Sequence, residues 1–212
     1  VFGDWSSDVC SSDLTAPGWQ EPLVVRKEGG TRVDYPLAKE NRASVRIAWA
    51  GQAAWSWERE IALGLMAQAF NNRLLDTIRE DLGGTYVVST NAVFSRFPLE
   101  QYIVIVSFDC APERAEELIE EVRSEAARLA GGKLDAMYAQ QIRAATQRDV
   151  DGSLRTNSFW IRALGNAVAH GLDFEVISRY RQQPLLSDPD LFSLLAAETL
   201  RPEREFVYVL HP

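Results

Sequence analysis

Residues that bind metals or form disulfides are scarce in this chain of 212 residues, which has two cysteines and two histidines. Two cysteines cannot form the disulfide framework of a small secreted domain. His170 and His211 lie far apart, and neither belongs to a His-x-x-x-His or His-x-x-Glu-His helix turn. The sequence therefore lacks the ligand set of an ordinary zinc site.

Other signatures are missing as well. The sequence has no Gly-x-x-x-x-Gly-Lys phosphate loop and no Gly-x-Ser-x-Gly nucleophile elbow. It also has no apolar run near the roughly 18 residues that a membrane-spanning helix needs. From the residues alone, the chain shows no complete catalytic centre and no membrane insertion.

Positive charge is in the minority, with 22 Lys and Arg against 30 Asp and Glu and a net charge of −8. Nucleic acids and anionic membranes attract basic surfaces, so this balance argues against either as the main partner. Hydrophobic residues make up 46% and charged residues 25% of the chain. These are the proportions of a globular domain that can bury a core.

The first fourteen residues, VFGDWSSDVCSSDL, have no helical or strand periodicity, and SSDV is nearly repeated as SSDL. The repeat resembles a translated sequencing adapter, so we expect residues 1–14 to be a disordered artefact; the alternative is a Ser/Asp linker. Residues 15–41 are rich in Gly, Pro and charge and are expected to be a linker or incoming segment. Residues 42–212 are expected to form the domain.

Hydrophobic periodicity predicts the first elements of that domain. Residues 45–49 alternate between apolar and polar side chains, which indicates a strand. A long helix follows, with Ser56 as its N-cap and Gly83-Gly84 at its end. One face of this helix carries an apolar residue at every fourth position: Ala62, Met66, Phe70, Leu74, Ile78 and Leu82.

The remaining pattern determines the fold class. Two adjacent strands are predicted over 85–94 and 101–109, with Pro98 in the turn, and then a helix from Pro112 to Gly131-Gly132. Adjacent strands joined by a short turn are antiparallel, so the fold class is α+β with an antiparallel sheet. Three or four helices and a last strand complete the prediction, across roughly 133–150, 155–169, 173–182, 188–200 and 205–210.

Two residues with reactive side chains are interpreted as structural. Cys110 precedes a helix N-terminus, which can lower a thiol pKa, but a cysteine at a strand end is more often a small core residue. His170 lies near the end of a predicted helix and is interpreted as a polar cap rather than a ligand.

The corner between the long helix and the following strand, NRLLDTIREDLGGTY, carries the most informative pair. Arg79 lies in the last helical turn, and Tyr86 begins the strand after the glycine break. A guanidinium fork and a phenol can both donate hydrogen bonds to a carbonyl or an oxyanion. The alternative is that Arg79 pairs with Asp76, Glu80 or Asp81 and that Tyr86 packs in the sheet.

A family resemblance bears on this choice. The run REDLGGTYVVS at residues 79–89 resembles the signature of the non-catalytic domains of insulinase/pitrilysin-family zinc metallopeptidases. The segments FDCAPERAEELIEEV and NSFW, and the final strand with its proline, resemble the C-terminal, non-zinc domain of the PqqL-like bacterial branch. The resemblance covers roughly residues 30–212. It implies the mitochondrial-processing-peptidase/LuxS-like metallohydrolase fold, with helices packed on one face of the sheet.

For function, the resemblance implies an enzyme of similar domains that closes around an unfolded peptide. Its zinc lies on a His-x-x-Glu-His helix of an N-terminal domain or subunit, so this chain is expected to bind no metal or other cofactor and to be inactive alone. Arg79 and Tyr86 match the arginine and tyrosine that contact the substrate backbone and the oxyanion. By the same resemblance, the protein is periplasmic or otherwise exported.

Two hypotheses follow from this resemblance. The chain is a substrate-clamping C-terminal domain of a zinc metalloendopeptidase that degrades peptides in a closed chamber, or it is a non-catalytic scaffold or binding subunit that partners a separate active peptidase. The reading frame upstream of the gene discriminates between them. No residue identifies the peptide substrate.

Overall fold

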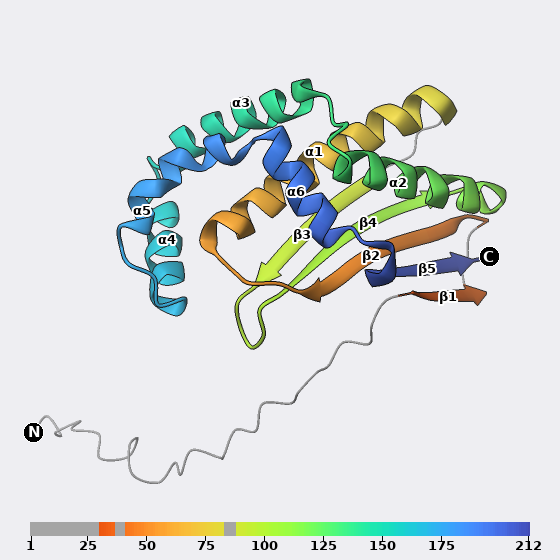
Figure 1. The fold of residues 1–212 in the computed structure, drawn as a ribbon, viewed down its shortest axis with the longest axis horizontal. Helices are drawn as coiled ribbons and strands as arrows, with labels where there is room; N and C mark the ends of the chain where they lie inside the picture. The colour runs from red at the N-terminus through yellow and green to blue at the C-terminus, as the bar shows by residue number, and fades with distance from the viewer. Residues whose placement is uncertain (1–29, 37–40, 83–87) are drawn as a thin grey trace, which may run out of the picture.

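A five-stranded sheet forms one layer of the molecule and helices form the other (Figure 1). The computed structural model describes residues 30–36, 41–82 and 88–212, with the backbone alone in residues 79–82. The strands are β1 (Thr31–Pro36), β2 (Ala43–Gln52), β3 (Val88–Ser95), β4 (Gln101–Cys110) and β5 (Glu205–His211). Their order in the sheet is β1-β5-β2-β4-β3.

Three of the four strand pairings are antiparallel. β2 pairs with β4 and β5, β3 pairs with β4, and only the pairing of β1 with β5 is parallel. The adjacent strands β3 and β4 form the predicted hairpin, with Pro98 in its turn. The predicted α+β class is therefore confirmed, with one parallel pair at the sheet edge.

The helices follow the predicted order. They are α1 (Trp57–Leu82), α2 (Ala115–Ala130), α3 (Ala136–Ser153), α4 (Asn157–Ala169), α5 (Val176–Arg179) and α6 (Pro189–Thr199). Short 3₁₀ segments are η1 (Pro112–Arg114), η2 (Tyr180–Leu186) and η3 (Pro202–Arg204). None of the helices in the described parts of the chain is long and apolar enough to cross a membrane.

Helix α1 packs against the sheet through its predicted apolar face. Ala62, Met66, Phe70, Leu74 and Ile78 are all buried in the main core. The predicted N-cap is also confirmed, because the backbone N–H of Arg59 donates to Ser56 Oγ at 3.1 Å.

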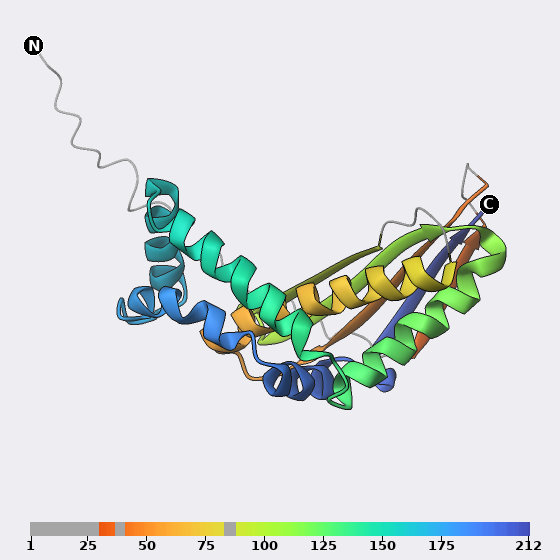
Figure 2. The same ribbon diagram turned by 90° about the horizontal axis from the view of Figure 1, so that it is seen from above.

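Among the described residues, helices cover one face of the sheet only. On β2, the odd positions from Ala43 to Trp49 point toward the helices and are buried, whereas Ser44 and Arg46 point the other way and are exposed. Figure 2 shows α1, α2 and α6 along the sheet, with α3, α4 and α5 extending beyond its end as a helical arm. We call the uncovered side of the sheet the open face.

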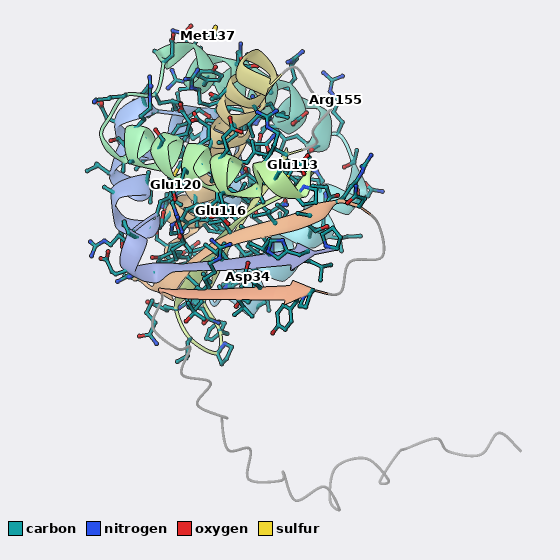
Figure 3. All side chains as sticks on the ribbon, turned by 90° about the vertical axis from the view of Figure 1, so that its right-hand side faces the viewer. Asp34, Glu113, Glu116, Glu120, Met137 and Arg155 are labelled. Carbon is teal, nitrogen blue, oxygen red and sulfur yellow. The ribbon has the colours of Figure 1, made fainter. Side chains whose placement is uncertain are left out.

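Strand β1 lies within the stretch that was expected to be a linker or incoming segment, and there the structure differs from the prediction. The alternation of apolar and polar residues that marks a strand is missing from β1, because the positions on its helix side are charged. Arg32 pairs with Asp34 and with Glu116 of α2 (Figure 3). His211 Nε2 lies 2.9 Å from Asp34 Oδ1. Hydrogen bonds from Arg32, and then from His211, lower the pKa of Asp34 to about 2.

Candidate functional site

The corner between α1 and β3 is the predicted site. Helix α1 ends at Leu82 and β3 begins at Val88, and the backbone of Arg79 lies in the last turn of α1. The side chain of Arg79 and the whole of Tyr86 lie outside the described residues, so the roles that the resemblance implies for them stay predictions. Ile78 is buried in the core, and the next position lies about 100° further round the helix.

Side chains just before this corner attach α1 to the neighbouring helices. Arg73 donates two hydrogen bonds to Glu125 of α2, from Nε to Oε2 at 3.0 Å and from Nη2 to Oε1 at 3.1 Å. The pair is partly buried, and the carboxylate raises the pKa of the Arg73 guanidinium above its ordinary value. The Tyr138 hydroxyl of α3 donates to Asp76 at 2.9 Å. Asp76, one of the three acids considered as partners of Arg79, is thus hydrogen-bonded to α3.

The sequence interpretation missed Asn71, which joins α1 to the edge of the sheet. Its side-chain oxygen accepts a hydrogen bond from the backbone N–H of Thr90 at 2.9 Å. Strand β3 is an edge strand, where outward backbone groups lack a strand partner, and Asn71 satisfies one of them. The only signal in the sequence is an asparagine inside a helix, where its intrinsic propensity is poor.

The histidines and Cys110 do not fit a zinc site. His170 is the C-cap residue of α4, and its ring stacks with those of Trp55 and Phe97, with centroid distances of 4.9 Å and 5.9 Å. His211 contacts Asp34 on the other side of the sheet. Cys110 is a core residue, and burial raises the pKa of its thiol to about 11, the reverse of what a thiolate ligand needs. Within residues 30–36, 41–82 and 88–212, no group of three or more His, Cys, Asp or Glu could hold a metal ion.

The open face carries a second feature that the sequence interpretation did not anticipate. A depression of about 970 Å³ lies over β2, β4 and β5. Its lining is mainly apolar, including Ile103, Ile105 and Phe206, and Arg46 and Asp109 are among its few charged residues. This surface has no complete set of catalytic groups and is described further below.

Comparison with known proteins places the chain in a family. The family described as the peptidase M16 inactive domain matches residues 1–145, more than half of the chain. The chain belongs to this family. The match confirms the resemblance to the non-zinc domains of insulinase/pitrilysin peptidases and accounts for the absence of a zinc motif from the sequence.

Several larger proteins are similar to this M16 inactive domain. The chloroplastic stromal processing peptidase of Arabidopsis thaliana is 24% identical over 153 residues, which are 70% of this chain and 12% of that protein. The ferredoxin protease FusC, solved with Arabidopsis ferredoxin, aligns with a TM-score of 0.74 and 19% identity over 88% of this chain and 20% of its own. The periplasmic protease PqqL of Escherichia coli aligns with a TM-score of 0.73 and 20% identity over 86% of this chain and 20% of its own. The M16 inactive domain thus spans a fifth or less of these relatives.

Proposed function

We propose that this M16 inactive domain is the substrate-clamping part of a zinc-dependent metalloendopeptidase. In this proposal, Arg79 and Tyr86 contact the peptide backbone next to the scissile bond, and the zinc belongs to another domain or subunit. The family match carries the proposal, because it spans the whole corner from α1 to β3. The periplasmic PqqL neighbour supports an exported location.

The frame around the corner supports these roles. Arg73 and Asp76 attach α1 to α2 and α3 shortly before the helix ends at Leu82. Ile78 is buried in the core, and the next backbone position, residue 79, lies about 100° further round the helix. A donor held on a rigid element needs little reorganisation when charge develops on a substrate oxygen.

The chemistry of the two side chains suits a peptide. A guanidinium presents a planar fork of N–H donors, which can hold a peptide carbonyl in one orientation. The tyrosine hydroxyl can donate one hydrogen bond to the oxygen that gains negative charge in the tetrahedral transition state. Neither group can activate water by itself, so the isolated domain is expected to be inactive.

The test uses the enzyme that combines this domain with its zinc-bearing part. Tyr86→Phe should lower kcat by about 100-fold with little change in KM, because the lost hydrogen bond forms mainly in the transition state. Arg79→Lys should also lower activity, because a point charge does not reproduce the fork. Tyr35→Phe is the matched control, since Tyr35 lies on β1 at the opposite edge of the sheet from β3.

Unchanged kcat in Tyr86→Phe and Arg79→Lys would reject the clamping role and favour the scaffold or binding subunit. Peptide cleavage by the purified 212-residue chain in the presence of zinc would contradict the assignment of zinc to another domain.

A further inference from the structure

A pocket of about 510 Å³ lies between α1, α3 and the edge strand β3, and we call it the α1–α3 pocket. Two helices form most of its walls through residues spaced three and four apart, which lie on one face of a helix. Helix α1 contributes Ile61, Gly64, Leu65 and Gln68, and α3 contributes Thr146, Asp149, Val150 and Ser153. Phe159 of α4 and Tyr180 of η2 add aromatic rings. The volume falls within the roughly 300–1,000 Å³ of ordinary ligand sites.

Gly64 leaves space in this pocket that the fold itself does not need. It lies in the interior of α1, where glycine is less favourable than alanine. A Cβ atom at this position would meet nothing within 4 Å, so packing within the chain does not require a glycine. The missing side chain deepens the pocket instead, as a ligand site requires.

Thr146 brings a buried hydroxyl to the pocket. The residue is 8% exposed, and its hydroxyl has no hydrogen-bond partner among the described residues. By contrast, the hydroxyls of Thr77 and Thr199, which also lie in helices, each donate to the carbonyl four residues earlier. A buried polar group without a partner is unfavourable, so a ligand that offers a hydrogen-bond donor is favoured here.

The charges at the pocket are negative. Glu60 and Asp149 are the charged residues among the described residues that line it. Asp149 is exposed and has no hydrogen-bond or ion-pair partner in the part of the chain that the structure describes. Glu60 accepts a hydrogen bond from the indole of Trp55 at 3.0 Å, and the neighbouring cation Arg59 is paired with Glu198. A pocket with this balance favours a cationic ligand.

We infer that the α1–α3 pocket binds the side chain of an arginine in an extended peptide. The apolar stem of the arginine lies against Leu65 and Val150. Its guanidinium donates hydrogen bonds to the carboxylate of Asp149 and to the hydroxyl of Thr146. The planar guanidinium also stacks on an aromatic ring such as that of Tyr180, which the ammonium group of lysine does less well.

The position of the pocket beside β3 selects a peptide over a free cation. Strand β3 is an edge strand, and the backbone N–H of Thr90 points outward to Asn71. Backbone groups alternate in direction along an antiparallel strand, so those of Ala92 and Phe94 also point outward. Both residues line the pocket. A peptide beside the pocket can therefore form main-chain hydrogen bonds that a free cation cannot form.

The pocket is separate from the corner between α1 and β3. Gly64 and position 79 lie on the same helix, about 22 Å apart along its axis. The inference rests on the proposed function only in taking a peptide as the ligand. Binding is measured without cleavage, so its failure is distinguishable from a failure of the roles proposed for Arg79 and Tyr86.

The first experiment measures peptide binding to the full chain by fluorescence anisotropy. The probe is a fluorescein-labelled peptide, Gly-Ala-Leu-Arg-Leu-Ala-Gly, and the matched peptide carries citrulline, which keeps the shape of arginine without its charge. The arginine peptide should bind about 10-fold more tightly, because its hydrogen bonds to a carboxylate are charge-assisted. Free argininamide should compete only at much higher concentrations, because it lacks the peptide main chain.

The second experiment changes the pocket from each of its two helices. Gly64→Leu fills the pocket and should abolish saturable binding without lowering the melting temperature, because leucine favours a helix and the space is free. Gly165→Leu is the matched control, since a Cβ at this position of α4 also meets nothing within 4 Å and Gly165 does not line the pocket. Asp149→Asn should weaken binding by about 10-fold. Asp151→Asn makes the same change on the same helix outside the pocket and should have no effect.

Five results would overturn the inference. They are no saturable binding of the arginine peptide by the wild type, equal affinity for the arginine and citrulline peptides, equal competition by argininamide, unchanged binding in Gly64→Leu, and equal weakening by Asp149→Asn and Asp151→Asn. The last result would show that net charge, rather than this pocket, attracts the peptide. Circular dichroism melting curves check that every variant is folded.

Discussion

Neighbouring residues of β4 meet opposite surroundings. Val104 and Val106 point into the helix-covered core, whereas Ile103 and Ile105 on the same strand point to the open face. Both sets are β-branched and apolar, so the middle of the strand, residues 103–106, has no polar side. Such strands are typical of sheets covered on both faces, yet the helices that the structure describes cover one. The hydrophobic pattern of a strand such as β4 therefore does not tell which face of the sheet the helices of the chain cover.

The largest expected contrast is between two aromatic residues. Phe70→Ala removes a ring from the core between α1 and the sheet and should lower the free energy of unfolding by about 3–5 kcal/mol. Tyr208→Ala on the open face should cost less than about 1 kcal/mol in the monomer, because the ring is already partly in water. Urea unfolding at low protein concentration measures both. Equal losses would show that the open face is covered within one chain.

The contrast between buried and exposed positions also applies to ion pairs. Glu125→Gln weakens the partly buried pair with Arg73 and should cost about 2–3 kcal/mol of unfolding free energy. Glu116→Gln weakens an exposed pair with Arg32 and should cost less than about 1 kcal/mol. Thermal unfolding of the two variants at the same salt concentration provides the measurement. A larger loss in Glu116→Gln would reverse the order expected from burial.

Two adjacent residues of β4, one on each face of the sheet, test the same contrast between the covered and the open face. Val106→Ala should cost about 2 kcal/mol, since it removes two buried methyl groups and leaves a cavity. Ile105→Ala removes more atoms but should cost less than about 1 kcal/mol in the monomer. Chemical denaturation of both variants gives the difference. The prediction fails if Ile105→Ala is the more damaging change.

The smallest expected effect concerns pH. Hydrogen bonds from Arg32 and His211 lower the pKa of Asp34 to about 2, below its unfolded value of about 3.9. Its stabilising contribution is therefore present above about pH 4 and is lost as the pH falls toward 2. Asp34→Asn should remove this part of the acid dependence of unfolding. The effect should stay below about 1 kcal/mol because the carboxylate is solvent-exposed. An unchanged unfolding curve between pH 4 and 2 would contradict the shift.

Periodicity was sufficient to predict most of the fold. The four-residue repeat of α1 and the hairpin around Pro98 both correspond to observed elements, because one side of each is buried against the core. The resemblance predicted that helices pack on one face of the sheet, but the sequence does not tell which of two apolar strand faces the helices cover. Strand β1 was not predicted, because charged residues such as Arg32 occupy the positions that face α2.

The candidate site was predicted from motif and resemblance rather than from periodicity. Arg79 and Tyr86 stay predictions, because the atoms that would test them lie outside the described residues. The attachments around them join residues that are distant in the sequence; Tyr138 and Asp76, for example, are 62 positions apart. Contacts of this kind depend on how α1 and α3 cross, which a local pattern does not contain.

The position of β5 has a consequence for how the protein is made. Strand β5 lies between β1 and β2, and its residue Phe206 pairs with Thr31 near the start of the sheet. At about 5–20 residues per second, a ribosome needs about 10–35 s to synthesise the intervening chain. During that time β1 lacks the strand that it pairs with, and β2 lacks its partner on the edge away from β4. The sheet is therefore completed only after nearly all of the domain has left the ribosome. Long-range pairings of this kind slow folding, and the nascent domain is therefore exposed to strand-mediated aggregation until its last strand arrives.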